Sequence, residues 1–465
     1  MLERIGRYAL WIGVFATVGW WLFSDTYAKY AVSNAASDLR VAFWGDYREF
    51  IMWQEILTDF ERLHPEISVH IEYITDRYDQ KIRQLFVADA APDVMLLQDE
   101  PFPRYMDSDK LEDLTPYLKT SSATIVDTSY WDTAWRSFGR YEETSDGSTP
   151  WRQYGIPTWG GCNLLFYNKS CFDRANVALP DDRTWTIDDF RTLCRQLTRD
   201  FDGDGRIDQF AFQVPNMTYW LPWHWGLGAR VLDEERRLFA LTGPEAEVSF
   251  QLMQDLMYRD RVAPNASELT IGQNVAFFTG RLALFSSGPW AMPFLNTTDM
   301  DYGVLHIPSG PGGRASRITW DAVTMFKGSK NKTMAWQLIQ HITDLKSQET
   351  VARIQRSVPA LKAAQTAFEG ENPRVQVRKF IEAVDQYARL QPISPHWELM
   401  MRAITKNVDL LLHPDPTLRV TPQNAIGLIL QEPNLLDNLP PADRNLADAY
   451  LLKLYASPEM RERGQ

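Results

Sequence analysis

Three short stretches near the start of the chain, LRVAFW (39–44), ISVHIEY (67–73) and VMLL (94–97), decide the fold class. The third is a continuous apolar run, the first is apolar apart from Arg40, and the second alternates apolar with polar residues, as strands do. Between them, over 50–63 and 78–88, apolar side chains recur at three- and four-residue steps, which predicts helices with one apolar face. Strand, helix, strand, helix and strand at these lengths predict right-handed crossovers and a parallel sheet covered by helices. The predicted class is α/β.

Polar and aromatic side chains follow two of these predicted strands. Trp44 ends the first and Asp46 follows it, and Gln98, Asp99 and Glu100 come after the third. Ligands of open α/β sheets bind beyond the carboxyl ends of the strands, so a binding site is expected there. The alternative is that Trp44 belongs to the core and that the acids only solvate a loop.

The composition excludes several classes of protein. A chain of 465 residues with 45% hydrophobic and 23% charged residues suits a soluble protein of more than one folding unit, not a polytopic membrane protein or a disordered chain. A formal net charge of -12 argues against nucleic acid as a partner. The 17 tryptophans are unusually many beside 23 phenylalanines and 18 tyrosines, which indicates a use for large flat side chains.

The three cysteines predict neither a disulfide scaffold nor a zinc module. Cys162, Cys171 and Cys194 cannot all pair with one another. Cys162 and Cys171 flank a short predicted strand, and an extended strand would hold them too far apart for a bridge. We expect unpaired thiols.

The first residues predict export. Arg4 and Arg7 precede an uncharged run over 8–24, which is the pattern of a signal peptide, so we expect residues 1–28 to be a signal peptide or a membrane anchor. The run is at the lower limit of length for a spanning helix, and its two final tryptophans also suit an interfacial anchor. Cleavage and retention as an inner-membrane tether both stay open, and the expected location is periplasmic or otherwise extracytoplasmic.

An aspartate-rich loop predicts a calcium site as one of two alternatives. Asp200, Asp202, Asp204 and Asp208 take positions one, three, five and nine of an EF-hand type loop, and a glycine takes position six. Position twelve is Ala211 in place of the bidentate glutamate, which weakens the case. The other alternative is an Asp-Gly turn that leads into a strand over 209–213.

No catalytic motif is present. Gly-x-Ser-x-Gly, His-Glu-x-x-His and the phosphate-binding loop do not occur, and the seven histidines form no pair at ligand spacing. A pair of carboxylates for glycoside hydrolysis stays open, because their separation is spatial. The sequence therefore favours a protein that is not an enzyme.

Beyond residue 38 the chain resembles the bacterial extracellular solute-binding proteins of ABC importers, in particular the sugar-binding family that includes maltose-binding protein. The pieces that carry the resemblance occur in the order of the family, and their joint order is more specific than any one of them. They are VAFWGD (41–46), FERLHPEISVHIEY (60–73), YDQKIRQLFVADAAPDVMLL (78–97), KLEDLTPYL (110–118), YGIPTWGGCNLLFYNKSCFDRA (154–175), TWTIDDFRTLCRQLT (184–198), DFDGDGRIDQFAF (200–212), FFTGRLALFSSGPW (277–290), DYGVLHIPSGPGG (301–313) and KGSKNKTMAWQLIQHIT (327–343).

The resemblance implies a two-lobed periplasmic-binding-protein fold with parallel or mixed sheets and a hinge. It places the N-terminal lobe at 39–155 plus 286–322 and the C-terminal lobe at 156–285 plus 323–465. The three connections are expected near 154–159, 283–287 and 320–326.

The resemblance also implies a ligand cleft between the lobes. A sugar ring has an apolar C–H face and a rim of hydroxyl groups, so it suits an aromatic plate flanked by acids and amides. The expected plates are Trp220, Trp290 and Trp397, and the expected polar anchors are Asp46, Glu100 and Asp321. The full expected set is Trp44, Asp46, Gln98, Glu100, Trp159, Trp220, Trp223, Trp290, Trp320, Asp321 and Trp397. The segment Trp159-Gly-Gly-Cys162 stands where some relatives have a sugar-binding acid.

The function implied by the resemblance is capture of a sugar or oligosaccharide by hinge closure, followed by delivery to the permease subunits of an ABC transporter. Two alternatives stay open on the same fold. One is a binder of another solute, such as a metal ion or a polyamine, and the other is a carbohydrate sensor or enzyme.

Overall fold

A seven-stranded mixed sheet forms the centre of the first lobe. The computed structural model describes residues 38–120, 125–233, 238–239, 241–370, 375–391 and 397–432, together with 445, 447 and 449–451. The strand order is β14-β6-β13-β3-β1-β2, with β15 paired to one end of β13. The strands are β1 (Asp38–Phe43), β2 (Ser68–Tyr73), β3 (Val94–Gln98), β6 (Gly155–Cys162), β13 (Ser316–Met325), β14 (Val358–Pro359) and β15 (Ala388–Leu390).

The predicted start of this sheet is confirmed. Strands β1, β2 and β3 run parallel, and β13 is antiparallel to both β3 and β6. The first helix begins at a capping box, in which Asp46 accepts hydrogen bonds from backbone N–H groups of the first turn and Glu49 accepts one from the Asp46 N–H. The cap fixes the end of β1 and the start of the helix, and so places the Trp44 loop.

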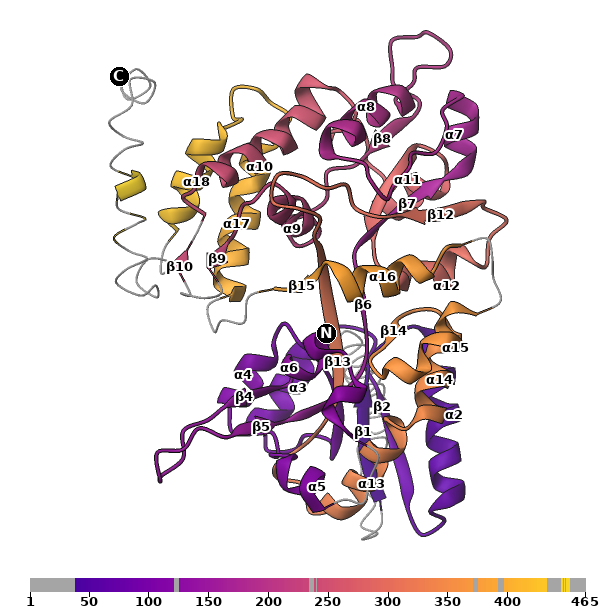
Figure 1. Ribbon diagram of the computed structural model, residues 1–465, viewed down its shortest axis with the longest axis vertical. Coiled ribbons are helices and arrows are strands. Elements are labelled where there is room, and N and C mark those ends of the chain that lie inside the picture. The colour runs from indigo at the N-terminus through magenta and orange to yellow at the C-terminus, as the bar shows by residue number, and fades with distance from the viewer. Residues whose placement is uncertain are drawn as a thin grey trace, which may run out of the picture.

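Helices cover the first sheet on both sides (Figure 1). They are α2 (Tyr47–Leu63), α3 (Tyr78–Val87), α4 (Phe102–Asp107), α5 (Thr115–Thr120), α6 (Asp132–Arg136), α13 (Lys332–Ile342), α14 (Leu345–Arg353) and α15 (Gln365–Glu369). A small antiparallel hairpin, β4 (Gly139–Tyr141) with β5 (Trp151–Gln153), extends from this lobe.

The second lobe has a four-stranded sheet of order β12-β7-β11-β8. Its strands are β7 (Leu164–Asn168), β8 (Phe210–Phe212), β11 (Leu282–Ser287) and β12 (Tyr302–Leu305), and a short pair consists of β9 (Leu232–Asp233) and β10 (Leu238–Phe239). The helices are α7 (Lys169–Ala175), α8 (Ile187–Leu197), α9 (Met217–Gly226), α10 (Pro244–Gln254), α11 (Gln273–Phe278), α12 (Met292–Leu295), α16 (Arg378–Gln386), α17 (Trp397–Leu411) and α18 (Pro422–Leu430). Strand β15 separates α16 from α17 along the chain.

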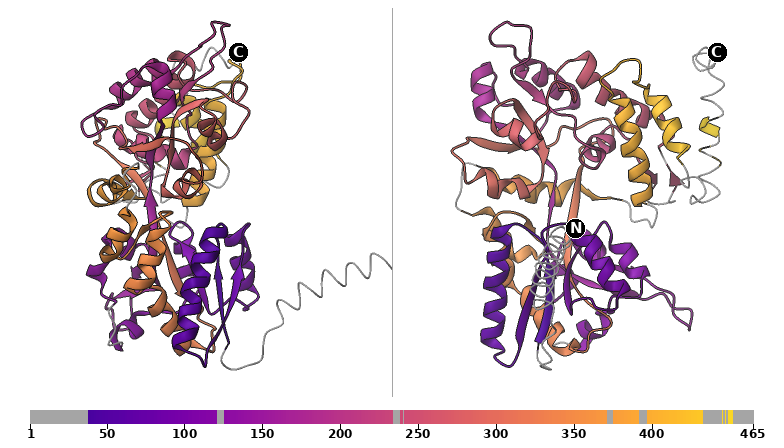
Figure 2. Two further views of the ribbon diagram at one scale, coloured as in Figure 1. Left: turned by 90° about the vertical axis from the view of Figure 1, so that its right-hand side faces the viewer. Right: turned by 180° about the vertical axis from the view of Figure 1, so that it is seen from behind.

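Two strands run from one lobe into the other. Figures 1 and 2 show β6 and β13 as the connection between the two bodies, and these strands pair along nearly their whole length. The expected connections near 154–159 and 320–326 fall on these two strands, in the part that belongs to the first sheet. The third expected connection, 283–287, is wrong because it lies inside β11, in the middle of the second sheet. Helix α15 lies in the first lobe and helix α16 in the second (Figure 1).

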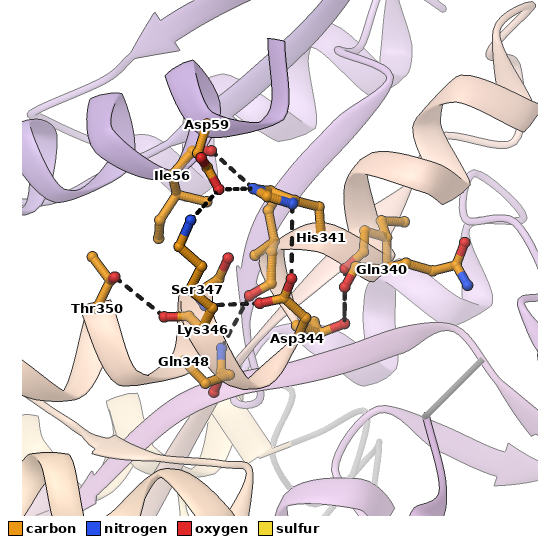
Figure 3. A network of polar contacts seen from close by, with 12 residues as sticks. Ile56, Asp59, Gln340, His341, Asp344, Lys346, Ser347, Gln348 and Thr350 are labelled. Atoms are coloured by element: carbon orange, nitrogen blue, oxygen red, sulfur yellow. Dashed lines mark hydrogen bonds and ion pairs between the residues drawn. The ribbon is translucent and has the colours of Figure 1, made fainter. Parts of the chain in front are cut away.

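The expected lobe boundaries need two corrections. Residues 286–310 belong to the second lobe, because β12 pairs with β7. Residues 323–370 belong to the first lobe, since α13 and α14 pack on α2. Figure 3 shows this packing at close range: Lys346 Nζ lies 2.7 Å from Asp59 Oδ2, and His341 Nε2 lies 3.1 Å from the carbonyl oxygen of Ile56. The physical reason is the direction of β13, which returns the chain to the first sheet before α13 begins.

The cysteines agree with the prediction. Cys162, Cys171 and Cys194 are buried free thiols. Burial raises the thiol pKa of Cys171 to about 11, so this group stays protonated at neutral pH.

Candidate functional site

A cavity of about 680 Å³ opens where β1 and β3 end. It brings together three of the residues expected from the sequence, namely Trp44, Asp46 and Gln98. The rest of its wall comes from elements that the sequence did not connect to the site. The other lining residues are Gly45, Thr75, Arg77, Tyr78, Asp79, Gln80, Arg83, Leu97, Pro101, Tyr105 and Arg356.

Trp44 presents a partly exposed indole to this cavity. Its ring centroid lies 6.4 Å from that of Tyr78, and the guanidinium carbon of Arg356 lies 6.0 Å from the indole centroid. Its Nε1 is buried and has no acceptor among the described residues. An aromatic face beside a guanidinium group suits a ligand with both C–H and hydroxyl surfaces.

An ion pair with Glu49 holds Arg356 in place. Its Nε lies 2.7 Å from Glu49 Oε2, the same oxygen that accepts the Asp46 N–H at 2.7 Å. Gly45 allows this arrangement, because it adopts φ +152° and a Cβ there would lie 2.3 Å from Glu49 Oε2. The loop after β1, the start of α2 and the segment before β14 are therefore joined through one carboxylate.

The second lobe contributes Trp290, which is also partly exposed. Two glycines of β6 make room for indole rings: a Cβ on Gly161 would lie 3.1 Å from Trp290 Cζ3, and a Cβ on Gly160 would lie 2.3 Å from Trp320 Cε3. Tyr219 stands edge-on to Trp290 with a centroid separation of 6.4 Å. Trp290 therefore lies against the crossing strand β6, at the junction of the two lobes.

Five of the seven tryptophans expected in the cleft are buried instead. Trp220 and Trp223 stack with a centroid separation of 5.5 Å inside the second lobe, where Trp220 Nε1 donates to Ser249 Oγ at 2.9 Å. The expectation that Trp220 and Trp397 serve as stacking plates is therefore wrong for this conformation. An indole that fills a core and one that lines a cleft have the same sequence spacing, so only the fold separates them. The five buried tryptophans are Trp159, Trp220, Trp223, Trp320 and Trp397.

The expected polar anchors differ in accessibility. Asp46 and Glu100 are exposed, and Glu100 Oε2 lies 3.2 Å from Arg317 Nη2. Asp321 is buried, contrary to expectation, and its Oδ2 accepts a hydrogen bond from Trp159 Nε1 at 2.8 Å. Arg317 also donates to Gln391 Oε1, at 3.1 Å, so it links β13 to the residue that follows β15.

Burial raises the pKa of three carboxyl groups that adjoin residues of the cavity wall. The pKa of Asp99 rises to about 7, although Arg317 opposes the effect. The pKa of Asp321 lies well above its usual range because of burial and, secondarily, because of the charge of Asp99. Burial also raises the pKa of Glu49, against the attraction of Arg356. These buried carboxyl groups therefore bind protons more tightly than exposed ones do.

The aspartate-rich loop brings three of its four predicted ligands together. Carboxylate oxygens of Asp200, Asp202 and Asp208 lie within 4.8 Å of one another, and Asp204 is not in this group. Both carboxylate oxygens of Asp200 also accept backbone hydrogen bonds, one from the Gly203 N–H at 2.7 Å and one from the Gly205 N–H at 2.9 Å. Position twelve, Ala211, is buried in β8 and offers no donor. The donor set fits calcium only in part.

The comparison with known families agrees with the fold. The profile of a family described as bacterial extracellular solute-binding protein matches residues 51–349, which is more than half of the chain. The chain belongs to this family. A curated binding protein of Brucella abortus is 23% identical over 268 residues, which is 56% of this chain and 63% of that protein. The chain thus spans less than two thirds of the length of this relative.

Solved structures show the same fold at low sequence identity. An ABC substrate-binding protein of Listeria monocytogenes, in complex with cycloalternan, is 19% identical and has a TM-score of 0.73, with 90% of this chain and 98% of that chain covered. The GacH receptor of Streptomyces glaucescens, solved unliganded and with acarbose, is 19% identical and has a TM-score of 0.70, at the same coverage. These similarities establish the two-lobed α/β fold.

The predicted export segment lies outside the described residues. Within the described part of the chain, no helix combines the length and the apolar character needed to cross a bilayer. The expectation for 1–28 therefore stays a prediction.

Proposed function

We propose that this protein is the substrate-binding component of an ABC importer and that it captures a sugar or oligosaccharide between its lobes without changing it chemically. The observation that carries the proposal is the pair Trp44 and Trp290. They are the two tryptophans of the expected set that remain partly exposed, and each lobe supplies one. The solved relatives named above, which bind cycloalternan and acarbose, support a saccharide as the ligand class.

The polar surroundings of the two indoles suit such a ligand. Asp46, Gln98 and Glu100 offer exposed acceptors, and Arg356 offers donors beside Trp44. Neutral hydroxyl groups both donate and accept, so a mixed rim of this kind recognises them without a net charge on the ligand.

Capture follows from a shift in population. A ligand that contacts both lobes stabilises the closed arrangement by its differential affinity, and a ratio of about 10⁴ would shift the equilibrium almost completely. Strands β6 and β13 serve as the hinge, and the closed surface is what the permease subunits recognise. An N-terminal segment retained as a tether over 8–24 would hold the protein in the periplasm near its permease and raise the effective concentration there.

A thermal-shift screen of mono- and oligosaccharides tests the proposal. A ligand at 100 times its dissociation constant stabilises the protein by about 2.7 kcal/mol. Calorimetric titration of each hit against Trp44→Ala and Trp290→Ala should show weaker binding for both variants. Trp151→Ala is the matched control, because Trp151 is partly exposed but lies in the β4–β5 hairpin. A shift with cations or polyamines and with no saccharide would refute the ligand class.

A further inference from the structure

Two aspartates lie side by side where the first sheet meets the crossing strands. Asp99 follows β3, and Asp321 lies in β13 opposite Gln98, the residue before Asp99. The Asp99 N–H donates to the Trp320 carbonyl at 3.0 Å, and the Trp320 N–H donates to Asp99 Oδ2 at 3.1 Å. Only 8% of Asp99 and 7% of Asp321 is exposed. The two carboxyl groups therefore share one poorly hydrated region.

Their hydrogen bonds do not compensate for two buried charges. Asp321 Oδ2 accepts from Trp159 Nε1 at 2.8 Å, but Asp99 Oδ1 has no partner among the described residues. An ionised carboxylate that leaves water loses several kcal/mol of solvation, and two adjacent ones also repel each other.

The charged groups that face the pair leave a surplus of acid. Arg317 and Glu100 act on Asp99, whereas Arg356 and Glu49 act on Asp321. Both guanidinium groups already have a carboxylate partner: Arg317 lies 3.2 Å from Glu100 and Arg356 lies 2.7 Å from Glu49. Four acids therefore face two arginines, so full ionisation would leave two uncompensated negative charges.

A proton is the cation that fits this place. Burial raises the pKa of both aspartates, and the charge of Asp99 raises that of Asp321 further. A carboxyl pair of this kind takes up one proton that neither group holds alone, and its two titration steps belong to the pair.

The pair lies where the two crossing strands are still part of the first sheet, with β13 between β3 and β6. The β13 ladder against β6 shifts its register between Asp321 and Ala322, and Thr158 Oγ1 of β6 donates to the Asp321 carbonyl at 3.0 Å. The regular ladder between the two crossing strands is therefore interrupted beside the pair. Water that enters at this interruption would relieve the ionised pair.

We propose that Asp99 and Asp321 hold one proton between the two of them where the crossing strands join the first sheet, and that its release to solvent at alkaline pH loosens these strands. The proton exchanges with bulk water, so the step needs no other reactant. If the protein captures a solute as proposed above, closure over that solute excludes water, favours the protonated pair and makes affinity fall as the pH rises. This last consequence rests on the proposed function, whereas the proton pair itself does not.

The test uses the full chain without any ligand. Infrared spectra between about pH 5 and pH 9 should show a protonated-carboxyl C=O band that disappears as the pair ionises. Asp99→Asn and Asp321→Asn should each remove most of this band, and Asp173→Asn, at an exposed aspartate, should leave it unchanged. A wild-type protein without such a band at neutral pH would overturn the proposal, even if neither variant folds.

Amide hydrogen exchange over 319–323 tests the effect on the crossing strands. After correction for the intrinsic pH dependence, exchange in the wild type should speed up several-fold above neutral pH, and this increase should be absent from the two asparagine variants. A corrected rate that does not change with pH would overturn the link between the proton and these strands. Because no saccharide is present in either measurement, a failed sugar screen and a failed proton test are separate results.

Discussion

The glycine pair of β6 gives a prediction that separates stability from binding. Alanine at Gly160 would place its Cβ 2.3 Å from the Thr319 carbonyl oxygen and 2.3 Å from Trp320 Cε3. Neither the backbone oxygen nor the fully buried indole can move away. Overpacking costs about 1–3 kcal/mol, and we expect the upper end of this range, about 3 kcal/mol. At roughly 2–4 °C per kcal/mol for a unit of lobe size, the melting temperature should fall by about 6–12 °C.

Alanine at Gly161 should behave differently. Its Cβ would lie 2.8 Å from Pro289 Cδ and 3.1 Å from Trp290 Cζ3, so the turn at 289–290 must shift by a few tenths of an ångström and tilt the partly exposed indole. We expect a stability loss of about 1 kcal/mol, which is the low end of the overpacking range. The tilt should cost saccharide binding about 0.5–1.5 kcal/mol of stacking, which corresponds to about a 2- to 12-fold loss of affinity.

Calorimetric melting of both variants and titration with the best ligand of the screen give the comparison. Gly272→Ala is the control, because no heavy atom lies within 4 Å of a Cβ at that position. If Gly160→Ala melts with the wild type, or if both variants lose equal stability and equal affinity, the placement of Trp290 and Trp320 on β6 is wrong.

Three further outcomes are expected. Trp220→Ala should lower the free energy of unfolding by about 3–5 kcal/mol in a denaturant titration, since it leaves a cavity in a packed core, whereas Trp290→Ala should lower it much less and should weaken ligand binding instead. We propose that the loop of Asp200 binds calcium. Calcium should then raise the melting temperature, magnesium should not, and Asp200→Asn should abolish the shift. A wild-type protein whose melting temperature does not respond to calcium would contradict the site. Hydrogen bonds from Lys346 and Arg62 lower the pKa of Asp59 to about 2, so the stability that the ionised Asp59 contributes is present above the usual aspartate pKa and is lost as the pH falls toward 2. Lys346→Ala should therefore destabilise the protein slightly near pH 7, by under about 1 kcal/mol at this accessible pair, and by less near pH 3. A difference that does not change with pH would contradict the assignment.

The sequence predicted the local elements of the fold well, and the reason is periodicity. The strands at 38–43, 68–73 and 94–98 and the helices between them have unambiguous spacing, and their order along the chain specifies a parallel sheet. The membership of later segments in a lobe could not be predicted in this way. A helix at 332–342 has the same pattern whichever sheet it covers, so the path of β13 decides.

The candidate site was predictable only in part. Trp44, Asp46 and Gln98 follow strands whose carboxyl ends meet, so their positions come from a general rule of the fold. Arg356 and Arg317 belong to no motif and reach the site through folding alone, from segments far along the chain. The role of each tryptophan depends on its neighbours: a glycine beneath Trp290 and a serine beside Trp220 separate a cleft residue from a core residue, and no spacing encodes either contact.

The shared strands have a consequence for biosynthesis. The first sheet has β13 between β3 and β6, yet β13 is made only after most of the second lobe, and β14 at the sheet edge is made later still. During synthesis or secretion the polypeptide emerges from its N-terminus. The three parallel strands β1, β2 and β3 therefore emerge long before β13, the strand that lies between β3 and β6. The nascent chain must wait in an incomplete, exposed state, in which a chaperone or a translocation motor can hold it, and the two bodies then reach their final form almost together.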